Sequence, residues 1–321
     1  MWYPIPSQFS LLKDMSDVTR SCPILYHYSM SPFSEKMRLA MGAFDATWRS
    51  VDVPAFPPRP DISRFIGGYR RIPVVQIGAQ FFCDTRLAYQ ALFESQIELN
   101  PLIADDEEVR LWAETEVFFA VLSAQKPVVA AHFLFRELGV KGLVRFMQDR
   151  MRMMREATVT MLSATDASAL LERYVKVLSE RLETLSFLSG EAPGHLDFSC
   201  YHPLWMAKRV NRSYLHQWPA SVCGWMSKME QLGHGVSEPA SLPDIEMAIR
   251  NDNVDASLWT LPRGWRPEEP VKVAPLDYGL DASSGKLLSM CDERIVIRRE
   301  TASGHPVYVH FPRAGFSVAR I

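Results

Sequence analysis

The feature that most restricts the fold is a strand–helix–strand pattern over residues 24–53. Residues 24–28 (ILYHY) form a short apolar run that is typical of a buried strand. Residues 31–42 (SPFSEKMRLAMG) place apolar side chains at helical spacing, and Pro32 suits the first position of a helix, where no backbone N–H is needed. Residues 47–53 (TWRSVDV) alternate like a second strand. The pattern predicts a β-α-β unit.

A second pattern follows a proline-rich loop at residues 53–61 (VPAFPPRPD). Residues 71–83 (RIPVVQIGAQFFC) are typical of two strands joined by a tight turn at Gly78. Asp84 then suits the start of a helix with the sequence TRLAYQALFE. Residues 22–98 are therefore expected to form a compact α/β layer structure.

The rest of the chain has a different character. Residues 105–250 are rich in Ala, Leu, Met, Glu and Arg and are expected to be all helical, with the apolar segment 194–210 as their buried central helix. The Met-rich segment 147–154 is interpreted as core filling between helices rather than as a binding surface. Residues 255–321 regain Pro and Gly, and the runs RIVIRRE and PVYVHFP predict a hairpin in a β-rich extension. Residues 1–21 are expected to be an N-terminal extension.

Composition excludes several classes of protein. A net charge of −2 and a pI near 6.5 argue against nucleic-acid binding. No apolar run is long enough to span a bilayer, and the opening residues lack the pattern of a signal peptide, so we expect no membrane attachment. The five cysteines are scattered without metal-ligand spacing, which favours reduced thiols in a cytoplasmic protein without a metal.

Four motifs in order resemble the glutathione transferase superfamily: SPFS at the first strand–helix turn, IPVV at the start of the hairpin, DT at the start of the next helix, and HLDFSCYHPLW in the helical part. The resemblance covers roughly residues 22–235. It implies a thioredoxin-like domain at residues 22–98, an all-helical domain at residues 105–250, and an unusual additional β-rich section at residues 255–321. It also implies a homodimer.

The resemblance gives Ser31 a chemical role. Several classes of the family place a serine at this turn, where its hydroxyl donates a hydrogen bond to the sulfur of glutathione and lowers the thiol pKa, with help from the positive end of the helix. A plain helix N-cap is the structural alternative for Ser31. Ser34, one turn further, is the second candidate.

Residues beside the hairpin are implied to hold the peptide part of glutathione. The family pattern implies a cis peptide between Ile72 and Pro73, with the backbone of Ile72 pairing with the cysteinyl residue like an added strand. A trans proline at a strand edge is the alternative. Arg71 is a candidate for the glycyl carboxylate, although a solvated pair of Arg70 and Arg71 explains the sequence equally well. Phe33 is included among the glutathione-binding residues.

The start of the next helix is implied to hold the γ-glutamyl group. Thr85 would bind its carboxylate at the helix N-terminus, and Asp84 would pair with its ammonium. The family more often has glutamate and serine here, and a simple N-cap is the alternative. Asp197 matches the family's helix-capping box with Gly194 in place of serine or threonine, and we interpret it as structural.

Two functions of different class remain open. The first is a glutathione transferase that adds the activated thiolate to a small hydrophobic electrophile, with glutathione as co-substrate. The second is a protein of the same fold that binds a ligand or partner without turnover. A thiol–disulfide enzyme is disfavoured because a serine stands where a redox cysteine is needed. The C-terminal section would either close over the electrophile pocket, form a partner surface, or pack on the helical bundle for stability alone.

Overall fold

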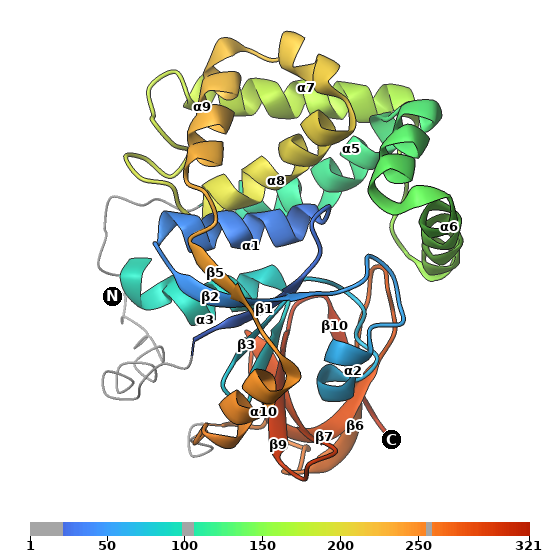
Figure 1. Cartoon of the computed structure of the whole chain (residues 1–321), viewed down its shortest axis with the longest axis vertical. Coiled ribbons are helices and arrows are strands. Elements are labelled where there is room, and N and C mark those ends of the chain that lie inside the picture. The colour runs from blue at the N-terminus through green and yellow to red at the C-terminus, as the bar shows by residue number, and fades with distance from the viewer. Residues whose placement is uncertain (1–21, 98–105, 255–258) are drawn as a thin grey trace.

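The computed structural model describes residues 22–97, 106–254 and 259–321, so the expected N-terminal extension at residues 1–21 lies outside the described residues. Figure 1 shows two layers, with a group of helices above a long sheet and α1 (Pro32–Ala43) lying between them. The chain has a thioredoxin-like domain, a helical domain and a C-terminal β-rich region, as the sequence predicted.

The N-terminal domain follows the predicted order with one addition. Its elements are β1 (Ile24–His27), α1, β2 (Thr47–Asp52), α2 (Pro60–Ile66), β3 (Val74–Ile77), β4 (Gln80–Cys83) and α3 (Thr85–Ile97). Strand β1 pairs parallel to β2 across the α1 crossover, and β3 is antiparallel to both β1 and β4. Helix α2 was not predicted; it begins at Pro60, which supplies a first residue that needs no N–H donor.

The helical domain packs around one buried helix. Its elements are α4 (Glu107–Trp112), the π-helical segment η2 (Ala113–Val117), α5 (Phe118–Ala124), α6 (Pro127–Glu156), α7 (Ala164–Arg181), α8 (His195–Val210), the short helix η3 (Arg212–His216) and α9 (Ala220–Gln231). Helix α10 (Leu242–Arg250) lies apart from them, because its Ile245 and Ile249 pack into a core on the other face of the sheet (Figure 1). Nearly the whole of α8 is buried, from His195 to Pro203, so it is the central helix that the sequence predicted.

The C-terminal strands join the N-terminal sheet. They are β6 (Glu269–Pro275), β7 (Ser283–Met290), β8 (Arg294–Glu300), β9 (Pro306–Pro312) and β10 (Phe316–Arg320). Strands β8 and β9 form the predicted antiparallel hairpin, and β9 then pairs parallel to β4. Together with β5 (Val236–Pro239), which pairs with the opposite edge at β2, they complete a ten-stranded sheet of described strands. The expected packing of this section on the helical bundle is therefore wrong in its place, because the strands extend the N-terminal sheet.

Alternating side chains of β1 show how the sheet separates two cores. Leu25 packs into the core that α1 forms with the helical domain. Ile24 and Tyr26 point to the opposite face and pack into a second core. That second core includes Val271 from β6 and Ile297 from β8, so the C-terminal strands share a hydrophobic core with the thioredoxin-like domain.

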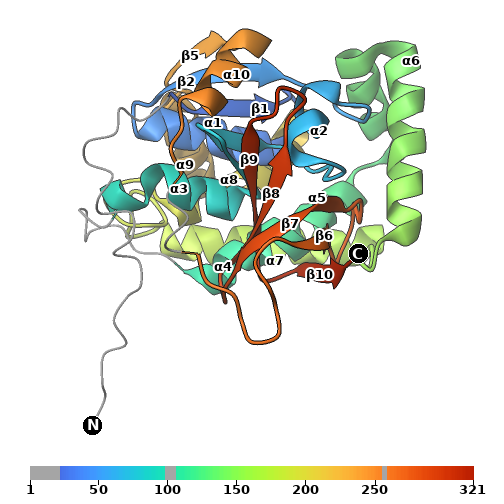
Figure 2. The ribbon, with the colours of Figure 1, turned by 90° about the horizontal axis from the view of Figure 1, so that it is seen from below.

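Helix α6 runs along one side of the molecule (Figure 2) and carries an exposed apolar stripe. The side chains of Val140, Val144, Met147 and Met151 are between 44% and 65% exposed. The interpretation of the Met-rich segment as core filling is therefore wrong for Met147 and Met151. Helix α6 bends by 101° away from the preceding helical stretch, Glu107–Ala124. No single helix among the described residues has the length and apolar composition of a membrane span, and only these two stretches taken together reach them.

Candidate functional site

Ser31 lies at the N-terminus of α1, directly after the loop that follows β1. Its backbone is extended and its Oγ accepts a hydrogen bond from the backbone N–H of Ser34 at 3.1 Å, so it is the N-cap of the helix. No described residue accepts the hydrogen of the Ser31 hydroxyl. This hydroxyl therefore caps the helix with its lone pair and keeps its O–H available for a ligand. Ser34 is completely buried, which removes it from reach of a ligand.

Ile72 forms a cis peptide with Pro73 and lies just before β3. It is 9% exposed, and within the described part of the chain its backbone N–H and C=O make no hydrogen bond. A buried backbone pair without partners is uncommon in folded proteins. An extended peptide that pairs with Ile72 would satisfy both groups.

Thr85 begins α3 and is connected to α1. Its Oγ1 accepts a hydrogen bond from Nζ of Lys36 at 3.1 Å, which leaves the hydroxyl hydrogen of Thr85 to donate elsewhere.

The preceding residue, Asp84, has a φ of 111°, which non-glycine residues rarely adopt. Its Oδ1 accepts a hydrogen bond from the backbone N–H of Arg86 at 2.8 Å. Burial and the nearby Glu114 raise the pKa of Asp84. Backbone outliers of this kind cluster at ligand sites.

Strand direction brings these candidates to one end of the sheet. Ser31 follows the carboxyl end of β1, and Ile72 precedes the amino end of the antiparallel β3. Thr85 follows the carboxyl end of β4, which is antiparallel to β3. The predicted thiol-binding, cysteinyl-binding and γ-glutamyl-binding groups are thus arranged on neighbouring elements at one end of the sheet.

A buried charge network beside this end of the sheet was not predicted. Lys36 is completely buried, and its Nζ lies 2.6 Å from Oε1 of Glu114 in the helical domain. The same oxygen accepts a hydrogen bond from Oγ of Ser199 on α8 at 2.6 Å. Burial alone would raise the pKa of Glu114, but its ion pair with Lys36 and the bonds from Lys36 and Ser199 lower it to about 2. The network joins α1, α3 and the helical domain.

Phe33 contacts the helical domain. Its ring lies 4.5 Å from the ring of His202 and 5.0 Å from that of Phe118, centroid to centroid. His202 is completely buried, and burial lowers its pKa to about 3, so the ring is neutral at ordinary pH. Phe33 therefore belongs to an apolar, aromatic wall beside the N-terminus of α1.

Arg71 is already paired with the C-terminal region. Its Nη2 donates hydrogen bonds to the carboxylate of Asp277 and to the backbone carbonyl of Tyr278. Its guanidinium also stacks over the ring of Tyr278, 4.0 Å from the centroid. Arg70 is paired too, with both carboxylate oxygens of Asp149 on α6 at 2.6 Å. The structure thus places neither arginine in the solvated pair considered above.

Asp197 organises the start of α8. Its carboxylate accepts hydrogen bonds from the backbone N–H groups of Leu188, Ser189 and Gly194 and from the indole N–H of Trp225, at 2.7–3.1 Å. Four donors around one fully buried carboxylate account for this residue structurally.

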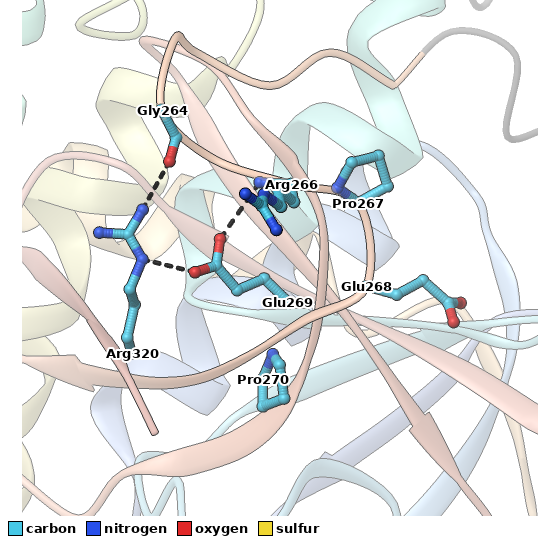
Figure 3. Close-up of a pocket in the computed structure, with 7 residues that line it drawn as sticks. All are labelled: Gly264, Arg266, Pro267, Glu268, Glu269, Pro270 and Arg320. Atoms are coloured by element: carbon cyan, nitrogen blue, oxygen red, sulfur yellow. Dashed lines mark hydrogen bonds and ion pairs between the residues drawn. The ribbon is translucent and has the colours of Figure 1, made fainter.

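One cavity lies at the outer edge of the C-terminal strands and is lined by Gly264, residues 266–270 and Arg320. It is an open depression of about 490 Å³. Figure 3 shows that its charges compensate one another, since Arg320 faces the carboxylate of Glu269 and the carbonyl of Gly264. A second cavity of about 60 Å³ is lined by Arg86 and Glu293, among others, and neither cavity includes Ser31 or Ile72. In the part of the chain that the structure describes, no group of three or more His, Cys, Asp or Glu is arranged to hold a metal.

Comparison with known proteins agrees with this geometry. Residues 25–98 match the family model of the glutathione S-transferase N-terminal domain. The solved structure of a GST-like protein from Pseudomonas syringae is 28% identical to this chain, with a TM-score of 0.69, over 93% of this chain and 99% of that chain. The N-terminal domain thus resembles that of the glutathione S-transferases, and 93% of the chain aligns with the fold of a GST-like protein.

Other likenesses are weaker. FzlA from C. crescentus is 16% identical with a TM-score of 0.45, over 72% of this chain and 93% of that chain. A possible glutathione S-transferase from Rhodopseudomonas palustris is 20% identical with a TM-score of 0.42, over 69% of this chain and 93% of that chain. No curated protein matches the chain in sequence.

Proposed function

We propose that this protein binds glutathione at the end of the sheet where Ser31, Ile72 and Thr85 lie, and conjugates it to a small hydrophobic electrophile. The observation that carries the proposal is a set of hydrogen-bonding groups without protein partners on neighbouring elements: the Ser31 hydroxyl hydrogen and the backbone of Ile72. A γ-glutamyl thiol peptide supplies acceptors and donors of the matching kinds.

The chemistry follows from the position of Ser31. Its O–H donates a hydrogen bond to the sulfur of glutathione, and the N-terminus of α1 adds a positive partial charge, so that the thiolate is favoured over the thiol. The thiol proton leaves to solvent. The sulfur lone pair then attacks the electrophilic carbon and forms the C–S bond. In a substitution the leaving group departs with the electron pair of its bond; in an addition the carbon π bond breaks, and its electron pair moves to the neighbouring atom, which takes a proton from solvent. Phe33 and Phe118 supply apolar surface beside the sulfur.

Ser31→Ala is expected to lower kcat for conjugation of glutathione to a chlorodinitrobenzene roughly 10- to 100-fold. This range corresponds to the loss of one charge-assisted hydrogen bond, about 1.5–3 kcal/mol. The dissociation constant of glutathione, measured by calorimetry, should change much less because the peptide contacts remain. Ser163→Ala is the matched control, since Ser163 caps α7 in the same way by accepting from the N–H of Asp166 at 3.1 Å, in an exposed position. Turnover by Ser31→Ala equal to that of the wild type would refute the role of the hydroxyl.

A second function, binding without turnover, is favoured by two other observations. Ser31 is only 2% exposed, and Arg71 is occupied by the C-terminal region. In addition, the apolar stripe of α6 from Val140 to Met151 offers a surface for a partner. Wild-type protein that binds glutathione but conjugates it no faster than the protein-free reaction would establish this second function. The cytoplasmic location stays a prediction from the scattered cysteines, and the homodimer stays a prediction of the family resemblance.

A further inference from the structure

The segment from Leu276 to Asp281 bridges the two domains beside the proposed site. It connects β6 to β7 in the C-terminal region. Thr158 of the helical domain donates its backbone N–H to the carbonyl of Asp277 at 2.7 Å and its hydroxyl to the carbonyl of Leu276 at 3.1 Å. The ring of Tyr278 packs edge-on against Phe119, 5.4 Å between centroids. These contacts fix the segment to the helical domain, and the bonds from Arg71 to Asp277 and Tyr278 fix it to the N-terminal domain.

The arginines next to the proposed site are already paired by the protein. Arg71 binds the carboxylate of Asp277, and Arg70 binds that of Asp149. The guanidinium of Arg59 donates to the backbone carbonyls of Pro54 and Arg70. Among these arginines, Arg59 is bonded only to neutral carbonyls, and the carboxylate of Asp149 is shared with Arg150, but Arg71 has a carboxylate of its own in Asp277.

The position of Arg71 decides which part of a ligand it meets. Arg71 directly precedes Ile72, whose backbone is proposed to pair with the cysteinyl residue. A peptide held at Thr85 by its γ-glutamyl end and at Ile72 by its middle has its other end directed away from Thr85. An extended chain spans about 3.5 Å per residue, so the ligand residue after the cysteine would lie next to Arg71 and Asp277.

We propose that Asp277 takes the place of a ligand carboxylate at Arg71, so that the site selects γ-glutamyl thiols whose far end is uncharged over glutathione with its free glycyl carboxylate. A ligand carboxylate placed there faces the negative charge of Asp277, which already pairs with Arg71. An ester or amide at the same place has no charge to repel. The inference rests on the proposed function and names the substrate class of that site.

The test compares two ligands with the full-length protein by calorimetry: glutathione, and glutathione esterified with ethanol at the glycyl carboxylate. The wild type is expected to bind the ester at least as tightly as glutathione. Asp277→Asn is expected to tighten glutathione binding about tenfold and to leave ester binding unchanged, because Arg71 then carries an unbalanced positive charge. The side chain of Asp277 is 43% exposed, so its replacement is not expected to disrupt folding, and Asp277→Ser provides a second neutral variant.

The matched control is Asp281→Asn. Asp281 lies in the same segment, with its carboxylate 3.5 Å from Arg70 and 50% exposed, and its removal should leave the preference between the two ligands unchanged. Tighter wild-type binding of glutathione than of the ester, with no change in either neutral variant of Asp277, would overturn the inference while leaving the proposed function intact. If no variant binds either ligand, the proposed function fails and the inference fails with it.

Discussion

Glu114→Gln is expected to lower the free energy of unfolding by about 3–5 kcal/mol, the cost of removing one partner of a buried ion pair. Lys36 is completely buried and its ammonium has the carboxylate of Glu114 as its charged partner at 2.6 Å. A neutral amide at position 114 would leave that positive charge in a low-dielectric interior without compensation. Urea unfolding at neutral pH measures the loss directly.

Two further variants identify the cause of this loss. Lys36→Met together with Glu114→Gln removes both charges and should recover most of the stability, since a buried pair and an apolar replacement are often nearly equal. Glu180→Gln is the control for an exposed pair, because Lys176 and Glu180 lie 3.8 Å apart with side chains 76% and 60% exposed. It should change the unfolding free energy by less than about 0.5 kcal/mol. A double variant as unstable as Glu114→Gln alone would contradict this account.

The same pair predicts the response to acid. The pKa of Glu114 is about 2 in the folded protein and near its ordinary value of 4.5 when unfolded, because Lys36 and Ser199 favour the carboxylate. A lowered folded-state pKa contributes stability that is fully present above pH 4.5 and is lost as the pH falls toward 2. Unfolding free energies measured across this interval should therefore fall more steeply for the wild type than for Glu114→Gln.

Asp197→Ala is expected to have a comparable effect on stability, about 4 kcal/mol, for a different reason. The carboxylate of Asp197 accepts from four donors, among them the N–H of Gly194 and the indole of Trp225. Each buried donor that loses its acceptor costs about 1–3 kcal/mol unless water reaches it. Thermal and urea unfolding should both show the loss, and Trp225 fluorescence should report the changed surroundings of its indole.

Asp166→Ala tests whether the position or the burial of the aspartate matters. Asp166 occupies the third helical position of α7, as Asp197 does in α8, but it is exposed and accepts from the Ser163 hydroxyl. Its removal should cost less than about 1 kcal/mol. Equal losses for the two variants would contradict the assignment of Asp197 to a buried structural network.

The core of the fold could be predicted from local patterns. Apolar runs bounded by prolines, such as residues 24–28 before Pro32, predicted β1, α1 and β2 because burial and backbone preference agree there. The hairpin around Gly78 and the buried helix α8 were predicted for the same reason. Motifs in the sequence predicted Ser31, Ile72 and Thr85 as site residues. The sheet topology explains why these motifs, distant in sequence, lie at one end of the sheet.

Other features depend on contacts between distant segments. Strand β5 has four exposed residues and no alternation, so its pairing with β2 leaves no signal in the sequence. The pairing of β9 with β4 joins segments more than two hundred residues apart, as does the bond between Arg71 and Asp277. The burial of Lys36 could not be predicted, because a lysine beside an apolar stripe usually reaches solvent and only the position of Glu114 explains why this one is buried.

The most direct test of the central proposal is the pKa of the glutathione thiol when bound, followed by thiolate absorbance at about 240 nm during a pH titration. Wild-type protein and the Ser163→Ala control are expected to lower the pKa of the bound thiol below that of free glutathione. In Ser31→Ala this pKa is expected to rise most of the way back to the value of free glutathione. A bound thiol that titrates like free glutathione in the wild type, or a shift that survives in Ser31→Ala, would contradict the proposal that Ser31 activates the thiol.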